Sequence, residues 1–275
     1  MPQMNASVGL LPLPRPLMTG EVLDAGFRLF RASILRTLPY SGLVVLILEL
    51  PTLYAILFSR ASLGSPFIAA YYLPIAHATA FLFTVPVLGV IMLRMFAVAN
   101  GQRPRFRVEI RVALKRWITG IIATVGAFAI PVALAILGPA FTNGLSSGAV
   151  FFLAFVLFWP TALFVVALPA FWCGGLGPFA AIAQSLRISL RRSWRMVGAI
   201  LASLCMVSVF VLLVSIIVGL MSPIFGRADL FLSATVQSLL YLVVGAFGVP
   251  YVLAVLIVAH RDLELRHRVR REVRA

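Results

Sequence analysis

One acidic residue stands in the middle of a long apolar run. Glu49 lies about ten residues into the run at 39–58, and Arg94 lies near the end of the next run. An ionisable side chain inside a membrane-spanning helix is costly, and by default it indicates a functional site. Two interpretations stay open. Glu49 is a proton or substrate site, or it is structural, either paired with Arg94 in an antiparallel hairpin or protonated and bonded to a neighbouring helix.

Basic residues gather in short segments between the apolar runs. Arginine suits contact with lipid phosphate because its planar fork donates two hydrogen bonds at once, and tryptophan is typical of the headgroup level. The candidates for contact with lipid headgroups are Arg28, Arg31, Arg111, Lys115, Arg187, Arg191, Trp194 and Arg195. The simpler alternative is that these residues only fix the orientation of the neighbouring spans.

The segment at 181–198 shows this pattern most clearly. Written as one helix, it places residues of one kind four positions apart, on neighbouring stripes. The stripes are apolar (Ile182, Leu186, Leu190, Trp194), basic (Arg187, Arg191, Arg195) and hydroxyl-bearing (Ser185, Ser189, Ser193). The spacing predicts a single interfacial helix that buries its apolar stripe and offers its arginines to lipid phosphate.

The sequence contains no pattern typical of a catalytic or metal site. The histidines His77, His260 and His267 are scattered, and none pairs with Cys, Asp or Glu at a spacing that binds a metal. The two cysteines, Cys173 and Cys205, form no disulfide framework. We therefore predict no metal, no cofactor and no enzymatic activity.

The composition indicates a polytopic integral membrane protein. Of the 275 residues, 62% are hydrophobic and 11% are charged, and the mean hydropathy is +1.06. Soluble domains contain about 25% charged residues, and a helix crosses a bilayer with about 20 apolar residues. We predict an all-α fold with six transmembrane helices, at about 39–58, 73–99, 117–137, 150–172, 196–221 and 230–259.

The Lys and Arg residues divide unequally between the two sides of these spans. The side that carries both chain ends receives 21 of the 23, and the other side receives only Arg60 and Arg227. The positive-inside rule therefore predicts a cytoplasmic location for both termini. The same rule accounts for the net charge of +15, so we expect anionic membrane lipids as partners and no nucleic acid.

Three parts of the chain follow from this arrangement. They are a flexible, proline-rich lead-in at 1–18, a six-helix transmembrane domain at 19–260 and a basic cytoplasmic tail at 261–275. Within the domain, a helix at the membrane surface is predicted over 19–37 and another over 106–116.

The plan of the domain repeats. Each unit consists of a basic interfacial helix, a span, an outer turn and a second span, so the six spans form three hairpins. Proline in the second spans recurs 83 and 81 residues apart, at Pro86, Pro169 and Pro250. This period favours duplication of a hairpin. The alternative is that prolines are simply frequent in membrane helices.

Three loose motifs cover most of the chain. The entry motif runs from Gly20 through Asp24 and Arg28 to Arg31, the central motif comprises Ala181, Ser185, Arg187, Trp194 and Gly198, and the closing motif is His260-Arg-Asp262-Leu263. Together they resemble a bacterial family named for the membrane domain of glycerophosphoryl diester phosphodiesterases. The sequence departs from that family at Arg191, where Gly is common, and at Glu264, where Arg is usual.

The resemblance implies a six-spanning fold in which Asp24, Ser185 and Asp262 occupy motif positions. Some relatives are fused to a soluble phosphodiesterase domain, and we expect no such catalytic domain here, because this chain has no room for one.

Three functions stay open at this point. The first is a non-enzymatic integral protein of the bacterial inner membrane, acting as an envelope or assembly factor or as the membrane module of a membrane or soluble protein partner. The second is a transporter or lipid-handling protein that uses Glu49 within the helix bundle. The third is a membrane-embedded lipid enzyme, which only scattered polar residues support.

Overall fold

A computed structural model of the chain describes residues 11, 13, 15–58, 72–128, 161–190, 193–221 and 230–272. Arg191 and parts of the spans expected at 117–137 and 150–172 lie outside the described residues. The described part is helical and contains no strand. Its helices are α1 (Thr19–Phe58), α2 (Leu73–Ala99), α3 (Phe106–Lys115), α4 (Trp117–Ala127), α7 (Ala167–Trp172), α8 (Pro178–Ser189), α9 (Ser193–Met221) and α10 (Leu230–Glu272).

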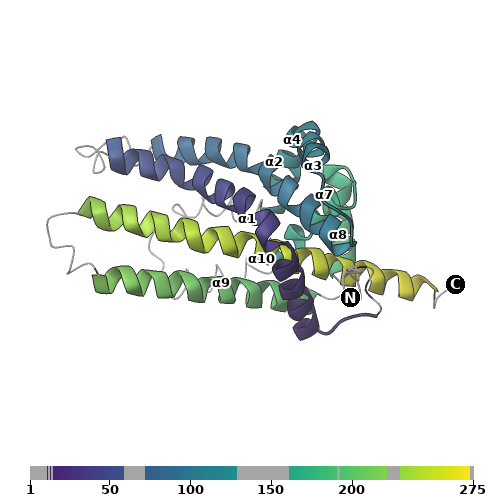
Figure 1. The fold of residues 1–275 in the computed structure, drawn as a ribbon. Helices are drawn as coiled ribbons and strands as arrows, with labels where there is room; N and C mark the ends of the chain where they lie inside the picture. The colour runs from purple at the N-terminus through teal and green to yellow at the C-terminus, as the bar shows by residue number, and fades with distance from the viewer. Residues whose placement is uncertain are drawn as a thin grey trace, which may run out of the picture.

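Four of these helices, α1, α2, α9 and α10, are long and apolar enough to cross a membrane, judged by length and composition. They run alongside one another, and α3, α4, α7 and α8 gather at one end of the bundle (Figure 1). α1 packs against both α2 and α10, whereas α9 packs chiefly against α10. The prediction of an all-α fold with membrane-length helices is confirmed.

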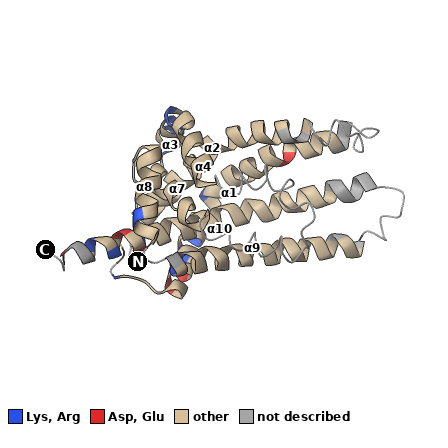
Figure 2. Ribbon diagram, turned by 180° about the vertical axis from the view of Figure 1, so that it is seen from behind, with Lys and Arg blue, Asp and Glu red and all other residues tan. Residues whose placement is uncertain are grey.

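The charged residues concentrate at the end of the bundle that carries the short helices. Lys and Arg residues (blue) lie on α3, on α8 and on the last turns of α10, and the first turns of α1 lie at the same end (Figure 2). The unequal division of charge along the sequence is therefore also an unequal division in space. We refer to this end as the charged end.

α1 combines two elements that the sequence predicts separately. The surface helix expected over 19–37 and the span expected over 39–58 form one helix, with Pro39 and Pro51 inside it. Figure 1 shows the first turns of α1 at an angle to the rest. Proline removes a backbone donor, and hydroxyls that bond the preceding turn bend a helix. Ser33, Thr37 and Ser41 bond in this way to the carbonyls four residues earlier.

α10 likewise continues beyond its predicted end. The span expected at 230–259 and the first part of the tail expected at 261–275 form one helix that ends at Glu272. Asp262 and Leu263 are buried, with 7% and 6% of their surface exposed. The helix continues because this segment has packing partners, which are the lead-in before α1 and helix α8.

The segment at 181–198 is not the single helix that its stripes predict. α8 ends at Ser189 and α9 begins at Ser193. The face that α8 buries contains Ala181, Ser185 and Ser189, whereas Trp194 on the apolar stripe is 66% exposed. Small side chains permit close approach of helices. α8 packs against α4 and α7, so packing rather than the width of the apolar stripe decides which face is buried.

Glycines allow close contact between α1 and α10. A Cβ atom on Gly26 would lie 2.7 Å from Cγ2 of Val255, and one on Gly245 would lie 2.8 Å from Cγ2 of Val45. Between these two contacts, Ser41 donates a hydrogen bond to the carbonyl oxygen of Ala246 at 2.6 Å. The interface between α1 and α10 thus forms the centre of the described bundle.

Candidate functional site

Arg94 does not pair with Glu49. Its guanidinium contacts Glu109 on α3, with Nε 2.9 Å and Nη2 2.8 Å from Oε2. Both side chains are almost fully buried, at 11% and 7% exposure. This contradicts the interpretation in which Glu49 pairs with Arg94, because the turn after α2 folds α3 back beside Arg94. This turn needs Gly101, whose φ of 69° disfavours residues with a Cβ.

Arg94 also joins α2 to α1. Its Nη1 donates to the carbonyl oxygen of Arg36 at 2.9 Å, and its guanidinium carbon lies 4.5 Å from the centroid of the Tyr40 ring. Through these contacts one side chain connects three helices at the charged end. The buried Arg94 cation thus has a carboxylate, a carbonyl and an aromatic ring as partners, which compensate for the cost of its burial. This arrangement indicates a structural role for Arg94.

Glu49 has a different polar environment, farther along the bundle. Its carboxylate interacts electrostatically with His77 on α2 and with Tyr241 on α10. The Thr52 hydroxyl, one turn along α1, lies 3.3 Å from Nε2 of His77. Glu49 therefore interacts electrostatically with titratable groups on two neighbouring helices, whereas Arg94 pairs with Glu109.

Tyr241 extends this environment to α9. Its hydroxyl accepts a hydrogen bond from Nε2 of Gln237 at 2.8 Å and lies 3.1 Å from Oγ of Ser215. All four long helices thus contribute polar side chains, which we call the polar cluster: Glu49, Thr52, His77, Ser215, Gln237 and Tyr241. From the sequence, Glu49 alone was predicted as a site residue and His77 was named only as a scattered histidine. Hydroxyl, amide and imidazole groups inside apolar runs were a usable signal for the others.

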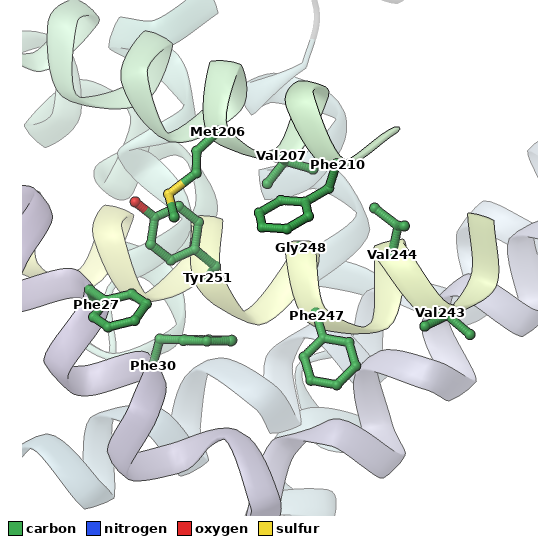
Figure 3. Close-up of a pocket in the computed structure, with 10 residues that line it drawn as sticks. All are labelled: Phe27, Phe30, Met206, Val207, Phe210, Val243, Val244, Phe247, Gly248 and Tyr251. Carbon is green, nitrogen blue, oxygen red and sulfur yellow. The ribbon is translucent and has the colours of Figure 1, made fainter. Parts of the chain in front are cut away.

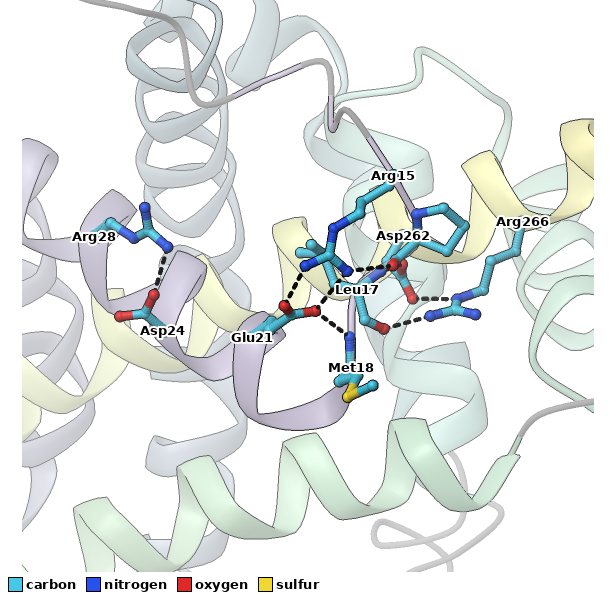
Figure 4. Close-up of polar contacts among 9 residues, drawn as sticks. Arg15, Leu17, Met18, Glu21, Asp24, Arg28, Asp262 and Arg266 are labelled. Atoms are coloured by element: carbon cyan, nitrogen blue, oxygen red, sulfur yellow. Dashed lines mark hydrogen bonds and ion pairs between the residues drawn. The ribbon is translucent and has the colours of Figure 1, made fainter.

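Asp262 connects the end of α10 to the residues before α1 (Figure 4). Its Oδ1 accepts the backbone N–H of Leu17 and its Oδ2 accepts Nε of Arg266, both at 2.7 Å. Arg266 in turn donates to the carbonyl oxygen of Leu17. Leu11 is also packed in the core and donates its N–H to the carbonyl of Ala99. This part of the lead-in is therefore held against α10 and the end of α2. The sequence predicted a flexible segment here.

We expect Asp262→Ala to release this docked segment. Leu17 would lose one charge-assisted hydrogen bond and Arg266 its carboxylate, which together amounts to about 1.5–3 kcal/mol of local stability. Cleavage by thermolysin of the bond between Leu17 and Met18 should then become about tenfold faster. The measurement is the rate of cleavage of the purified protein. Asp24→Ala is the control, since Asp24 pairs with Arg28 on an exposed face, and equal rates for the two variants would contradict the role of Asp262.

The other family-motif positions are structural in different ways. Ser185 is fully buried and donates to the carbonyl oxygen of Leu163. Asp24 forms its ion pair with Arg28 on the exposed surface of α1. The three motif positions therefore lie at separate places in the structure and do not form one site.

The predicted headgroup contacts are exposed side chains at the charged end. The described members are Arg28, Arg31, Arg111, Lys115, Arg187, Trp194 and Arg195. Arg28 is engaged with Asp24. The basic members lie on four different helices, because the segment at 181–198 is divided between α8 and α9.

An apolar groove lies between α1, α9 and α10 (Figure 3). It encloses about 400 Å³ and its lining is almost entirely apolar. The lining residues are Phe27, Phe30, Met206, Val207, Phe210, Val243, Val244, Phe247, Gly248 and Tyr251. The rings of Phe27 and Phe30 pack edge-on against Tyr251, with centroids 6.5 and 5.8 Å away. Such a surface can hold an acyl chain but offers almost no polar group to a soluble ligand.

Two observations bear on catalysis. Desolvation raises the pKa of the Cys173 thiol to about 12, with the charge of Arg261 opposing the rise. The thiol is therefore protonated at neutral pH and is a poor nucleophile. Among the residues that the structure describes, no group of three or more His, Cys, Asp or Glu side chains is placed to hold a metal ion.

No family model, no curated protein and no solved structure matches the chain.

Proposed function

We propose that the protein is a non-enzymatic integral protein of a bacterial inner membrane, and that it acts as a membrane module that binds lipid in the apolar groove. The observation that carries this proposal is the groove itself, which lies between three membrane-length helices and is lined by aromatic and aliphatic side chains. Burying an acyl chain there replaces loose lipid contact with packing against rings.

The proposed topology has six transmembrane helices arranged as three hairpins, with both termini in the cytoplasm. The gathering of Lys and Arg at the charged end supports this orientation. The apolar helices α4 and α7 adjoin segments outside the described residues, and they would belong to the third and fourth spans. We also propose membership of the family named for the glycerophosphoryl diester phosphodiesterase membrane domain, on the three motifs alone.

Native mass spectrometry of the purified protein tests lipid binding. We expect the wild type to retain phospholipid after delipidating washes and Val244→Trp to lose it, because Val244 lines the groove and an indole would fill it. The matched control is Val209→Trp, since Val209 is exposed on α9 and is absent from the lining. Equal retention by both variants would count against the groove as the binding site.

The polar cluster favours a second function, a transporter that uses Glu49. Polar side chains from four helices at membrane depth are typical of ion and substrate pathways. Glu49→Gln keeps the shape of the side chain and removes its charge. Transport requires that this variant accumulates normally but fails to restore function in a deletion strain. Full restoration would exclude a proton-carrying role for Glu49 and leave the lipid-binding proposal intact.

A further inference from the structure

A polar pocket lies at the charged end, between α8 and the last turns of α10. It encloses about 500 Å³ and shares no lining residue with the apolar groove. Its polar wall consists of Gln184 and Arg187 from α8 and of Glu264, His267 and Arg268 from α10. The remaining lining is aliphatic. The pocket therefore combines a polar wall with room for an organic group beside it.

The polar wall carries an excess of positive charge. Glu264 already binds Nη1 of Arg261 at 2.5 Å and accepts Nε2 of Gln184 at 3.5 Å, so its charge is largely neutralised. Arg187 and Arg268 form no ion pair with any residue in the described part of the chain. Two arginines thus line the pocket from opposite helices without an anionic partner, and His267 is a third basic residue of the lining.

We propose that this pocket binds the phosphate group of a phosphate-bearing ligand. Guanidinium groups match the geometry of phosphate oxygens and bind them through paired, charge-assisted hydrogen bonds. The volume exceeds what a bare phosphate needs, and the aliphatic wall accepts the organic part of the ligand. Lipid headgroups and soluble phosphorylated compounds share this chemistry. The proposal does not depend on lipid in the apolar groove.

The test compares wild type with the double variant Arg187→Gln/Arg268→Gln. One probe is inorganic phosphate added to the full chain in a neutral detergent, with thermal unfolding as the readout. The other is nanodiscs of phosphatidylcholine with or without phosphatidylglycerol, with retained lipid measured by mass spectrometry. The control is Arg105→Gln/Arg107→Gln, which removes the same charge from exposed positions at the start of α3. Arg187→Lys/Arg268→Lys keeps the charge and guards against a folding defect.

We expect the double glutamine variant to bind at least about tenfold more weakly, since one lost charge-assisted hydrogen bond corresponds to at least that factor. The control should bind like the wild type, and the lysine variant should bind with intermediate strength. Stabilisation by inorganic phosphate without arginine-dependent retention of phosphatidylglycerol would identify a soluble ligand. Arginine-dependent retention of phosphatidylglycerol alone would identify a lipid headgroup. Equal loss in the glutamine variant and the control, or no loss in either, would overturn the proposal.

Discussion

Replacing Glu109 by glutamine is expected to destabilise the protein by about 3 kcal/mol. The substitution leaves the buried Arg94 guanidinium without its anion, and removal of one partner from a buried pair costs about 3–5 kcal/mol. The carboxylate accepts from Arg94 through one oxygen, Oε2, while its Oε1 is buried without a partner in the described structure. Glutamine keeps the shape, so the loss measured is that of the charge.

Unfolding in mixed micelles, followed by far-UV circular dichroism, measures this loss. The control is Asp24→Asn, which removes a carboxylate from the exposed pair with Arg28 and should leave the midpoint unchanged. The double variant Arg94→Met/Glu109→Gln should lose less than the sum of its single variants, because no unpaired cation remains. A Glu109→Gln protein as stable as Asp24→Asn would show that Arg94 gains little from its buried anion.

The sequence predicts the apolar helices well because they depend on local composition. The surface helix expected over 106–116 is α3, which ends one residue earlier. The sequence did not predict that α3 supplies the partner of Arg94, because the position of Glu109 depends on how the chain folds back after Asn100 and Gly101. The available signal was that Glu109 is the one acidic residue of this basic segment. An acidic residue requires a nearby cation when it is buried, but the sequence does not show that Glu109 is buried.

The division of 181–198 has a related cause. Amphipathic stripes predict which face of an isolated helix prefers an apolar phase. In the structure Ser185 is fully buried and its hydroxyl donates to the Leu163 carbonyl. The hydroxyl stripe of α8 therefore packs against the rest of the protein. A short hydroxyl that bonds a backbone carbonyl costs little to bury and allows close approach. Hydropathy alone cannot distinguish this face from a solvated one.

The candidate site was predictable only in part for the same reason. Glu49 is conspicuous because charge inside an apolar run is rare. His77 and Tyr241 are brought near Glu49 by the packing of α2 and α10 against α1, which no local pattern specifies. The pocket between α8 and α10 likewise joins residues about 80 positions apart, such as Arg187 and His267.

Gly26→Val is expected to destabilise the protein by about 3 kcal/mol, through the interface on which the bundle is centred. Overpacking a closely packed interface costs about 1–3 kcal/mol, and sometimes more. Here a Cβ would lie 2.7 Å from Cγ2 of Val255 and 3.1 Å from its Cα. The side chain can rotate away, but the backbone atom cannot, so α1 and α10 must separate. Separation also weakens the bond from Ser41 to Ala246.

Gly42→Val is the matched control, because Gly42 lies on the same helix and a Cβ there meets nothing within 4 Å. Valine forms helix better than glycine, so this variant should be at least as stable as the wild type in the same unfolding experiment. Val255→Ala added to Gly26→Val should restore only part of the stability, since it removes Cγ2 but leaves Cα in place. Full restoration would place the clash in the Val255 side chain alone, whereas equal stability of Gly26→Val and Gly42→Val would exclude close approach of α1 and α10 at Gly26.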